Sequence, residues 1–128
     1  MNVAGIGIDA VEIDRFASAV EMWGDNFIDK VFTPKEREYF EFKKLNPINM
    51  AGKFAAKEAV KKALPDGAEI GLRWSDIEIL NGSDGKPYAC LHGQAKKIMD
   101  KFNLAEVFVS ISHTKNIATA NAMVVKNG

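Results

Sequence analysis

The sequence predicts a compact α+β domain in which a mostly antiparallel sheet packs with a long central helix. Apolar residues at helical spacing alternate with short β-rich segments in the order β-α-α-α-β-β-α-β-β. One helical stretch, from about Ile48 to Leu64, is longer than the others. The later β-rich segments are separated by short turns, which favours antiparallel pairing. The chain is expected to form one domain, residues 1–128.

The N-terminal segment is predicted to be a strand followed by a helix. Alternation over Val3–Ile8 separates two faces of that strand, with Ile6 and Ile8 on one and Gly5, Gly7 and Asp9 on the other. The helix is expected from about Val11 to Trp23, because apolar side chains recur there at helical spacing: Ile13, Phe16, Ala17 and Val20.

Two further helices have clear boundary signals. Thr33-Pro34-Lys35-Glu36 is typical of a helix start, since Thr33 can cap, proline fits the first turn and Glu36 completes a capping box. That helix should end before Asn46-Pro47. The longest helix, from about Ile48 to Leu64, has a buried stripe that predicts close packing against a neighbour: Ala51, Phe54, Ala55, Ala59 and Ala63.

The C-terminal half is predicted to hold two strand pairs and one helix. The segment 81–85 (Asn-Gly-Ser-Asp-Gly) is a dense turn signal between two β-rich stretches. The segment 113–115 (His-Thr-Lys) predicts a second hairpin. The expected elements are strands at Asp76–Leu80 and Pro87–His92, a helix at Gln94–Phe102, and strands at Val107–Ser112 and Asn116–Val125.

Composition excludes several classes of protein. Seventeen basic and seventeen acidic residues cancel, so no overall field attracts a nucleic-acid backbone. Cys90 is the only cysteine, which excludes an intramolecular disulfide, a thiolate zinc site and CxxC redox chemistry. The N-terminal apolar run lacks the basic residues of a secretory signal, and no stretch reaches the length of a membrane span. We therefore expect a cytoplasmic protein without a membrane or nucleic-acid partner.

Two carboxylates are candidates for chemistry. Asp9 follows the N-terminal strand on the face of Gly5 and Gly7, where a ligand or metal can approach the backbone. Spacing alone favours the alternative that Asp9 caps the next helix. Glu58 continues the apolar row of the longest helix, so it is at least partly buried and needs a partner. That partner is either Lys62, in an ordinary i,i+4 pair, or a metal ion.

Three lysines form a row along the longest helix. Lys53, Lys57 and Lys61 are spaced at i, i+4 and i+8, where like charges repel one another. Such a row is usually a solvated face, but this one lies close to Glu58 and Lys62. Phosphate on the lysines, with a divalent ion on two carboxylates, would form a coherent site, because Mg²⁺ is commonly held by carboxylates and substrate phosphates.

The segment Ser110-Ile111-Ser112-His113 does not indicate a serine hydrolase. It lacks a G-x-S-x-G elbow, and a serine next to a histidine in sequence is not by itself a nucleophile–base pair. His113-Thr114 at the expected hairpin tip either binds a phosphate or forms only a turn. Nucleotide-binding folds are also excluded, since neither G-x-G-x-x-G nor a Walker A sequence occurs.

Several segments together resemble the motifs of the 4′-phosphopantetheinyl transferases. Gly7-Ile8-Asp9 and the helix segment Phe54–Lys62 resemble the two signature motifs. Four further features resemble the short holo-acyl-carrier-protein synthase type, and the resemblance extends from about Val3 to Val125. These features are Arg15 at its offset from Asp9, Phe32-Thr33 with Glu36, the segment Asn81–Pro87, and Ser110-Ile111-Ser112-His113-Thr114.

This resemblance implies the fold of that family and a Mg²⁺-dependent reaction. The 4′-phosphopantetheine group of coenzyme A would be transferred to a serine hydroxyl of an apo acyl carrier protein, in support of fatty acid biosynthesis. The other product would be adenosine 3′,5′-bisphosphate. The resemblance also implies a homotrimer with active sites between neighbouring subunits.

Matched positions assign roles to individual residues. Asp9 and Glu58 match the metal ligands, and with Lys62 they make up the expected catalytic group. Either Glu58 or a metal-bound water takes the serine proton. Contacts with coenzyme A are expected from the lysine row of Lys53, Lys57 and Lys61. His113 and Thr114 match a phosphate-binding corner supplied across the subunit interface, and Pro87 lies where the adenosine end packs.

The acyl carrier protein is expected to dock on the first helix. Carrier proteins of this kind are acidic, whereas this helix has more acidic than basic residues, so docking should depend on Arg15 and on apolar contacts such as Met22. The alternative is a non-catalytic module that binds coenzyme A or a nucleotide and keeps its affinity without a divalent metal. A metal-dependent hydrolase of coenzyme A is a weaker alternative.

Overall fold

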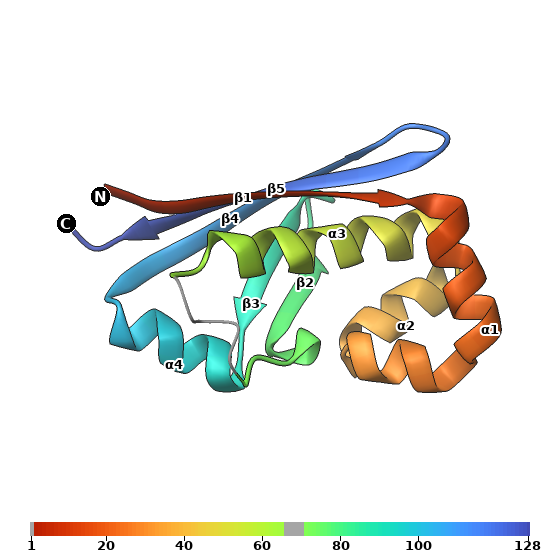
Figure 1. The fold of residues 1–128 in the computed structure, drawn as a ribbon, viewed down its shortest axis with the longest axis horizontal. Coiled ribbons are helices and arrows are strands. Elements are labelled where there is room, and N and C mark those ends of the chain that lie inside the picture. The colour runs from red at the N-terminus through yellow and green to blue at the C-terminus, as the bar shows by residue number, and fades with distance from the viewer. Residues whose placement is uncertain (1, 66–70) are drawn as a thin grey trace.

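Two antiparallel sheets and a long helix organise the fold (Figure 1), which the computed structural model describes for residues 2–65 and 71–128. The larger sheet contains β1 (Asn2–Glu12), β5 (Ile117–Lys126) and β4 (Leu104–His113), with β5 in the centre. The smaller sheet pairs β2 (Ile77–Asn81) with β3 (Pro87–Leu91). The predicted α+β class and both predicted hairpins are confirmed.

The α-helices follow the predicted order with one difference in length, and a short 3₁₀ turn that was not predicted precedes β2. They are α1 (Ile13–Val31), α2 (Pro34–Phe42), α3 (Pro47–Ala63), the single 3₁₀ turn η1 (Trp74–Asp76) and α4 (Gly93–Lys101). α1 extends beyond the expected end at Trp23, but Gly24 (φ 58°, ψ −140°) kinks it there. The sequence analysis therefore ended the helix where the structure has the kink, and it missed the second helical segment, which follows Gly24. No helix of the described ranges is long and apolar enough to cross a bilayer.

Glycines in β1 allow α3 to pack directly on the larger sheet. A Cβ on Gly7 would lie 2.0 Å from the Ala59 carbonyl oxygen, and a Cβ on Gly5 would lie 2.0 Å from that of Ala63. Neither position has room for a side chain. Figure 1 shows α3 running along one face of the sheet, with α1 and α2 at one end and α4 toward the other. The predicted close packing of the small-residue stripe is confirmed. It places the C-terminal half of α3, which contains Ala59 and Ala63, against β1.

The isoleucine face of β1 is the exposed one. Ile6 is 74% exposed and Ile8 is 66% exposed, because the glycine face packs against α3. Phe108 of β4 and Met123 of β5 stand in register with Ile6 on this outer face and are also exposed. The outer face of the sheet therefore exposes several large apolar side chains, which residues 2–65 and 71–128 leave uncovered.

The α2 start has the predicted capping box and a second, unpredicted role. Thr33 Oγ1 accepts a hydrogen bond from the Glu36 backbone N–H at 3.2 Å, and Glu36 Oε1 accepts one from the Thr33 N–H at 2.8 Å. Glu36 is also fully buried, and its Oε2 accepts a bond from the Ile79 N–H at 2.7 Å. The capping glutamate thus joins α2 to β2.

Candidate functional site

Asp9 lies within β1 and does not cap α1. It stands opposite Ala120 of β5, and the N-cap position belongs to Glu12, whose side chain makes no capping bond. The Asp9 carboxylate instead meets α3, where its Oδ1 lies 3.0 Å from Lys62 Nζ. The capping alternative is wrong because the strand continues past the predicted end at Ile8 to Glu12.

Lys62 and Glu58 each bond to a residue outside α3. Lys62 Nζ donates to Asp9 Oδ1 and to the Ile8 carbonyl oxygen, each at 3.0 Å. Glu58 Oε1 accepts a hydrogen bond from Trp74 Nε1 at 2.7 Å. The expected helix pair between Glu58 and Lys62 is therefore replaced by two contacts that tie α3 to β1 and to η1.

Asp9 and Glu58 line one cavity. Its volume is about 420 Å³, and Arg15 from α1 is part of its wall. Most of the remaining wall is apolar, including Phe16, Phe27 and Phe54. Glu12 is a third carboxylate of the wall, and carboxylates with a cation in a partly apolar wall fit an ionic ligand with an apolar portion.

Lys53 and Lys57 do not reach this cavity. Lys53 is 3% exposed; its Nζ donates to the Ile79 carbonyl oxygen at 2.7 Å and to Asn81 Oδ1 at 2.6 Å. Its ammonium group also lies 4.3 Å from the centre of the Tyr39 ring. Burial lowers the pKa of Lys53 to about 8. The side chain therefore joins α3 to β2 inside the protein.

Lys57 is more deeply buried than Lys53 and has more protein partners. It is fully buried, 2.7 Å from Glu36 Oε1, and donates to the carbonyl oxygens of Trp74 at 3.1 Å and Ile77 at 2.5 Å. Burial lowers the pKa of Lys57, and the charge of Glu36 opposes that shift. The expected coenzyme A contacts of Lys53 and Lys57 do not fit these positions, because both ammonium groups are occupied by protein partners.

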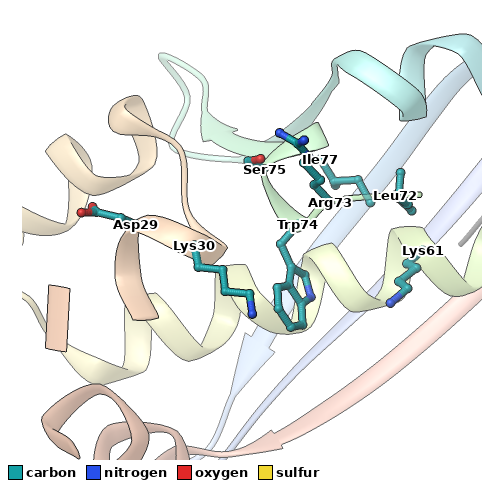
Figure 2. Close-up of a pocket in the computed structure, with 8 residues that line it drawn as sticks. All are labelled: Asp29, Lys30, Lys61, Leu72, Arg73, Trp74, Ser75 and Ile77. Atoms are coloured by element: carbon teal, nitrogen blue, oxygen red, sulfur yellow. The ribbon is translucent and has the colours of Figure 1, made fainter. Parts of the chain in front are cut away.

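Lys61 borders a different cavity, of about 520 Å³. Figure 2 shows the indole ring of Trp74 between the side chains of Lys30 and Lys61, with Arg73 above it in the view. Lys61 Nζ lies 6.0 Å from the centre of the Trp74 ring. Lys61 thus borders a cavity, beside Trp74, the residue that contacts Glu58.

The remaining expected site residues lie away from Asp9 and Glu58. His113 and Thr114 are exposed at the tip of the β4–β5 hairpin, where Thr114 Oγ1 accepts bonds from the Asn116 N–H at 3.2 Å and the Ile117 N–H at 3.1 Å. Pro87 begins β3, opposite Asn81. Met22 is exposed on α1. A single chain therefore brings together Asp9, Glu58, Lys62 and Arg15, but not the hairpin corner or Pro87.

Trp74 and Glu36 were not among the predicted site residues. Glu36 was recognised as part of the capping box and of a motif shared with the resembling family, without a role in the site, and Trp74 belongs to no motif. The burial of Lys57 is the signal that points to Glu36, because a buried lysine needs a counter-charge. No spacing rule connects Trp74 with Glu58, because their contact depends on how η1 returns to α3.

Comparisons with known proteins agree with the fold and with the matched motifs. The family model for the 4′-phosphopantetheinyl transferase superfamily matches residues 5–120. A holo-[acyl-carrier-protein] synthase of Alkaliphilus oremlandii is 44% identical over 123 residues, which are 96% of this chain and 99% of the relative. One from Clostridium novyi is 48% identical over 122 residues, covering 94% of this chain and 86% of the relative.

Solved structures give the same result. The acyl carrier protein synthase of Plasmodium yoelii with ADP bound superposes with a TM-score of 0.87 at 38% identity, covering 99% of this chain and 98% of that one. The Helicobacter pylori holo-[acyl-carrier-protein] synthase in complex with coenzyme A gives 0.76 at 30% identity, covering 93% and 98%.

The fold, the two carboxylates and these matches define a transferase, and the chain belongs to the 4′-phosphopantetheinyl transferase superfamily. Within it, the chain belongs to the holo-[acyl-carrier-protein] synthases. It is therefore an enzyme, and the expected alternative of a non-catalytic binding module is not supported.

Proposed function

We propose that this chain transfers the 4′-phosphopantetheine group of coenzyme A to a serine hydroxyl of an apo acyl carrier protein. The products are the holo carrier protein and adenosine 3′,5′-bisphosphate. The observation that carries the proposal is the meeting of Asp9, Glu58 and Lys62 between β1 and α3 in a chain of this superfamily. Relatives solved with coenzyme A support the choice of donor.

Asp9 and Glu58 fit a Mg²⁺ ion as ligands. Each has one oxygen engaged by protein, Asp9 Oδ1 by Lys62 and Glu58 Oε1 by Trp74, and their second oxygens accept no hydrogen bond from residues 2–65 or 71–128. No cluster of three or more acidic, histidine or cysteine ligands occurs in those ranges. A site with two carboxylates suits Mg²⁺, which keeps several waters and is completed by substrate phosphates. The ion would neutralise charge on the diphosphate when bound.

The protein residues around this pair have separate tasks in the transfer. Lys62 is half exposed, so its ammonium group is accessible to the phosphate that leaves with the adenosine moiety and can stabilise or protonate it. Glu58 is one of two candidates to accept the proton of the attacking serine, the other being a water beside it. The apolar wall with Phe16, Phe27 and Phe54 excludes water and suits the pantetheine arm.

Other contacts with coenzyme A and the carrier protein follow from the remaining residues. Arg15 and Met22 on α1 are proposed to dock the carrier protein, since Arg15 also lines the cavity and both are exposed. Lys61 is proposed to meet a phosphate of coenzyme A. Pro87, His113 and Thr114 lie outside the cavity of their own chain, so we assign them to the site of a neighbouring subunit.

A homotrimer is supported by the outer face of the larger sheet. Ile6, Ile8, Phe108 and Met123 are exposed there, and a monomeric protein rarely leaves such a set of apolar side chains in water. Sedimentation equilibrium of the wild type should give three times the chain mass. Ile6→Asp should shift the distribution to smaller species, whereas a wild-type monomer would contradict the assignment.

The cellular setting is part of the same proposal. Holo carrier proteins are needed for fatty acid biosynthesis, and we place this enzyme in that process in the cytoplasm. The absence of a membrane-spanning helix from the described residues is compatible with that location.

Intact-mass spectrometry tests the proposed reaction. Apo acyl carrier protein incubated with the enzyme, coenzyme A and Mg²⁺ should gain the mass of one phosphopantetheine group, and a chelator should prevent the gain. Bisphosphate release without a mass gain would instead indicate hydrolysis of coenzyme A. Absence of both products with folded enzyme would contradict the proposal.

A further inference from the structure

Trp74 holds one oxygen of the Glu58 carboxylate. Its indole Nε1 donates a hydrogen bond to Glu58 Oε1 at 2.7 Å. We propose that Trp74 is a positioning residue for Glu58: the indole N–H fixes the orientation of the carboxylate and leaves Oε2 as the oxygen that binds the divalent ion. This inference rests on the proposed function, because it takes Glu58 to be a metal ligand.

The indole is itself fixed at its ring and at its backbone. The Trp74 ring packs on Phe54, 6.0 Å between centroids, and Phe54 lines the cavity that contains Asp9 and Glu58. The Trp74 carbonyl oxygen accepts a hydrogen bond from Lys57 Nζ at 3.1 Å. Lys57 is fully buried and paired with Glu36. The ring and the main chain of Trp74 are therefore both attached to α3.

The turn that carries Trp74 is also constrained from its other side. Asp76 Oδ2 accepts a bond from the Arg73 N–H at 3.1 Å, and the Asp76 N–H donates to the Arg73 carbonyl oxygen at 3.0 Å. The His92 N–H donates to the Asp76 carbonyl oxygen at 2.8 Å, which ties η1 to the end of β3. A donor held in this way can orient a carboxylate without moving when a ligand binds.

This arrangement matches what outer-shell groups do at metal sites. A hydrogen bond to a ligating carboxylate sets its orientation, and its removal typically costs 10- to 100-fold in metal affinity or activity. A residue that served only to pack the core would affect folding stability and leave metal affinity unchanged. The two roles therefore predict different measurements on the same variant.

Trp74→Phe separates these roles, since phenylalanine keeps an aromatic ring against Phe54 but has no N–H donor. The probe is Mn²⁺ in the presence of coenzyme A, with free Mn²⁺ measured by electron paramagnetic resonance. We expect the Mn²⁺ dissociation constant to rise about tenfold or more. Trp23→Phe is the matched control, because Trp23 is 63% exposed on α1, and its Mn²⁺ affinity should equal that of the wild type.

A measurement on the wild type covers the case in which Trp74→Phe fails to fold. The chain has two tryptophans, so ¹⁵N-indole labelling gives two N–H resonances, and Trp23→Phe assigns them. We expect the Trp74 indole N–H to exchange with water much more slowly than that of Trp23, and Glu58→Gln to shift its resonance. Exchange as fast as that of Trp23 would overturn the proposal.

The outcomes distinguish this inference from the proposed function. Wild-type enzyme that transfers the group and binds Mn²⁺, together with an unchanged Mn²⁺ affinity in folded Trp74→Phe, overturns the positioning role alone. Wild-type protein that neither binds Mn²⁺ with coenzyme A nor modifies a carrier protein overturns both.

Discussion

Lys62 Nζ lies 3.0 Å from Asp9 Oδ1, and this contact joins the two signature motifs of the chain, one in β1 and the other in α3. The same ammonium group donates to the Ile8 carbonyl oxygen at 3.0 Å. Asp9, which lines the cavity, thus holds Lys62 through its Oδ1, and a bound diphosphate would compete with Asp9 for the ammonium group.

Replacing Lys62 should impair turnover while leaving the fold intact. Lys62→Met removes the cation proposed to stabilise the leaving phosphate, and we expect kcat to fall about 10²-fold or more. Lys35→Met is the control, because Lys35 is exposed on α2, and it should retain normal rates. Equal rates in the two variants, measured by carrier-protein mass, would remove Lys62 from the mechanism.

Glu58→Ala should abolish metal-dependent transfer. The change removes one of two proposed metal ligands and a candidate base, so activity should drop at least about 10²-fold at saturating coenzyme A. Circular dichroism should show the wild-type fold. Glu38→Ala, at an exposed position of α2, should behave as wild type. Near-normal turnover by Glu58→Ala would exclude its metal role.

Lys57 should be important for stability and not for coenzyme A binding. Lys57→Met leaves the Glu36 carboxylate buried without its cation, and we expect urea unfolding to show a loss of about 3–5 kcal/mol. The double variant Glu36→Gln with Lys57→Met should recover part of that loss, because glutamine is neutral and its amide oxygen still accepts a bond from one of the two backbone N–H groups that Glu36 satisfies. A raised KM for coenzyme A with unchanged stability would instead restore the contact expected from the sequence.

Lys53 should make stability depend on pH above neutrality. Its folded-state pKa is lowered from 10.5 to about 8, so between these values the unfolded chain binds more protons than the folded one. Stability attributable to Lys53 should therefore rise as the pH increases from about 8 to about 10.5, by at most about 3 kcal/mol. Comparing urea unfolding of wild type and Lys53→Gln across this range isolates the effect. Parallel curves would contradict it.

Gly7→Ala should destabilise the contact between β1 and α3. The new Cβ would lie 2.0 Å from the Ala59 carbonyl oxygen, so strand and helix must separate, at a cost of about 3 kcal/mol. Gly52→Ala is the control, since its Cβ would lie 3.0 Å from a side-chain methyl group, Ile111 Cγ2, instead of 2.0 Å from a backbone oxygen, and alanine favours helix. Thermal unfolding should show a marked loss for Gly7→Ala only.

The order of the elements was readable from the sequence because their signals are local. The capping box at Thr33 and Glu36 and the turn at residues 81–85 depend on neighbouring residues alone, and both occur as predicted. The length of α1 was underestimated because Gly24 interrupts the helix without ending it. A local pattern cannot distinguish a kink from an end.

The candidate site was predictable only in part. Asp9, Glu58 and Lys62 were selected from the sequence, and the structure brings Asp9 and Glu58 to one cavity with Lys62 bound to Asp9. Their partners were not predictable, because Glu58 bonds to Trp74 instead of Lys62. The lysine row was treated as one surface, yet Lys53 and Lys57 turn inward to β2, η1 and α2.

By itself, then, the sequence determined the element order, the family and the residues that meet between β1 and α3, because periodicity, caps, turns and motifs are properties of the linear chain. Tertiary structure decided which face of β1 is buried, which lysines have protein counter-charges and which donor orients Glu58. Those outcomes depend on contacts between residues distant in sequence, such as Lys57 with Glu36 and Trp74 with Glu58. Burial makes such contacts necessary, since a charge removed from water must find a partner wherever the fold supplies one.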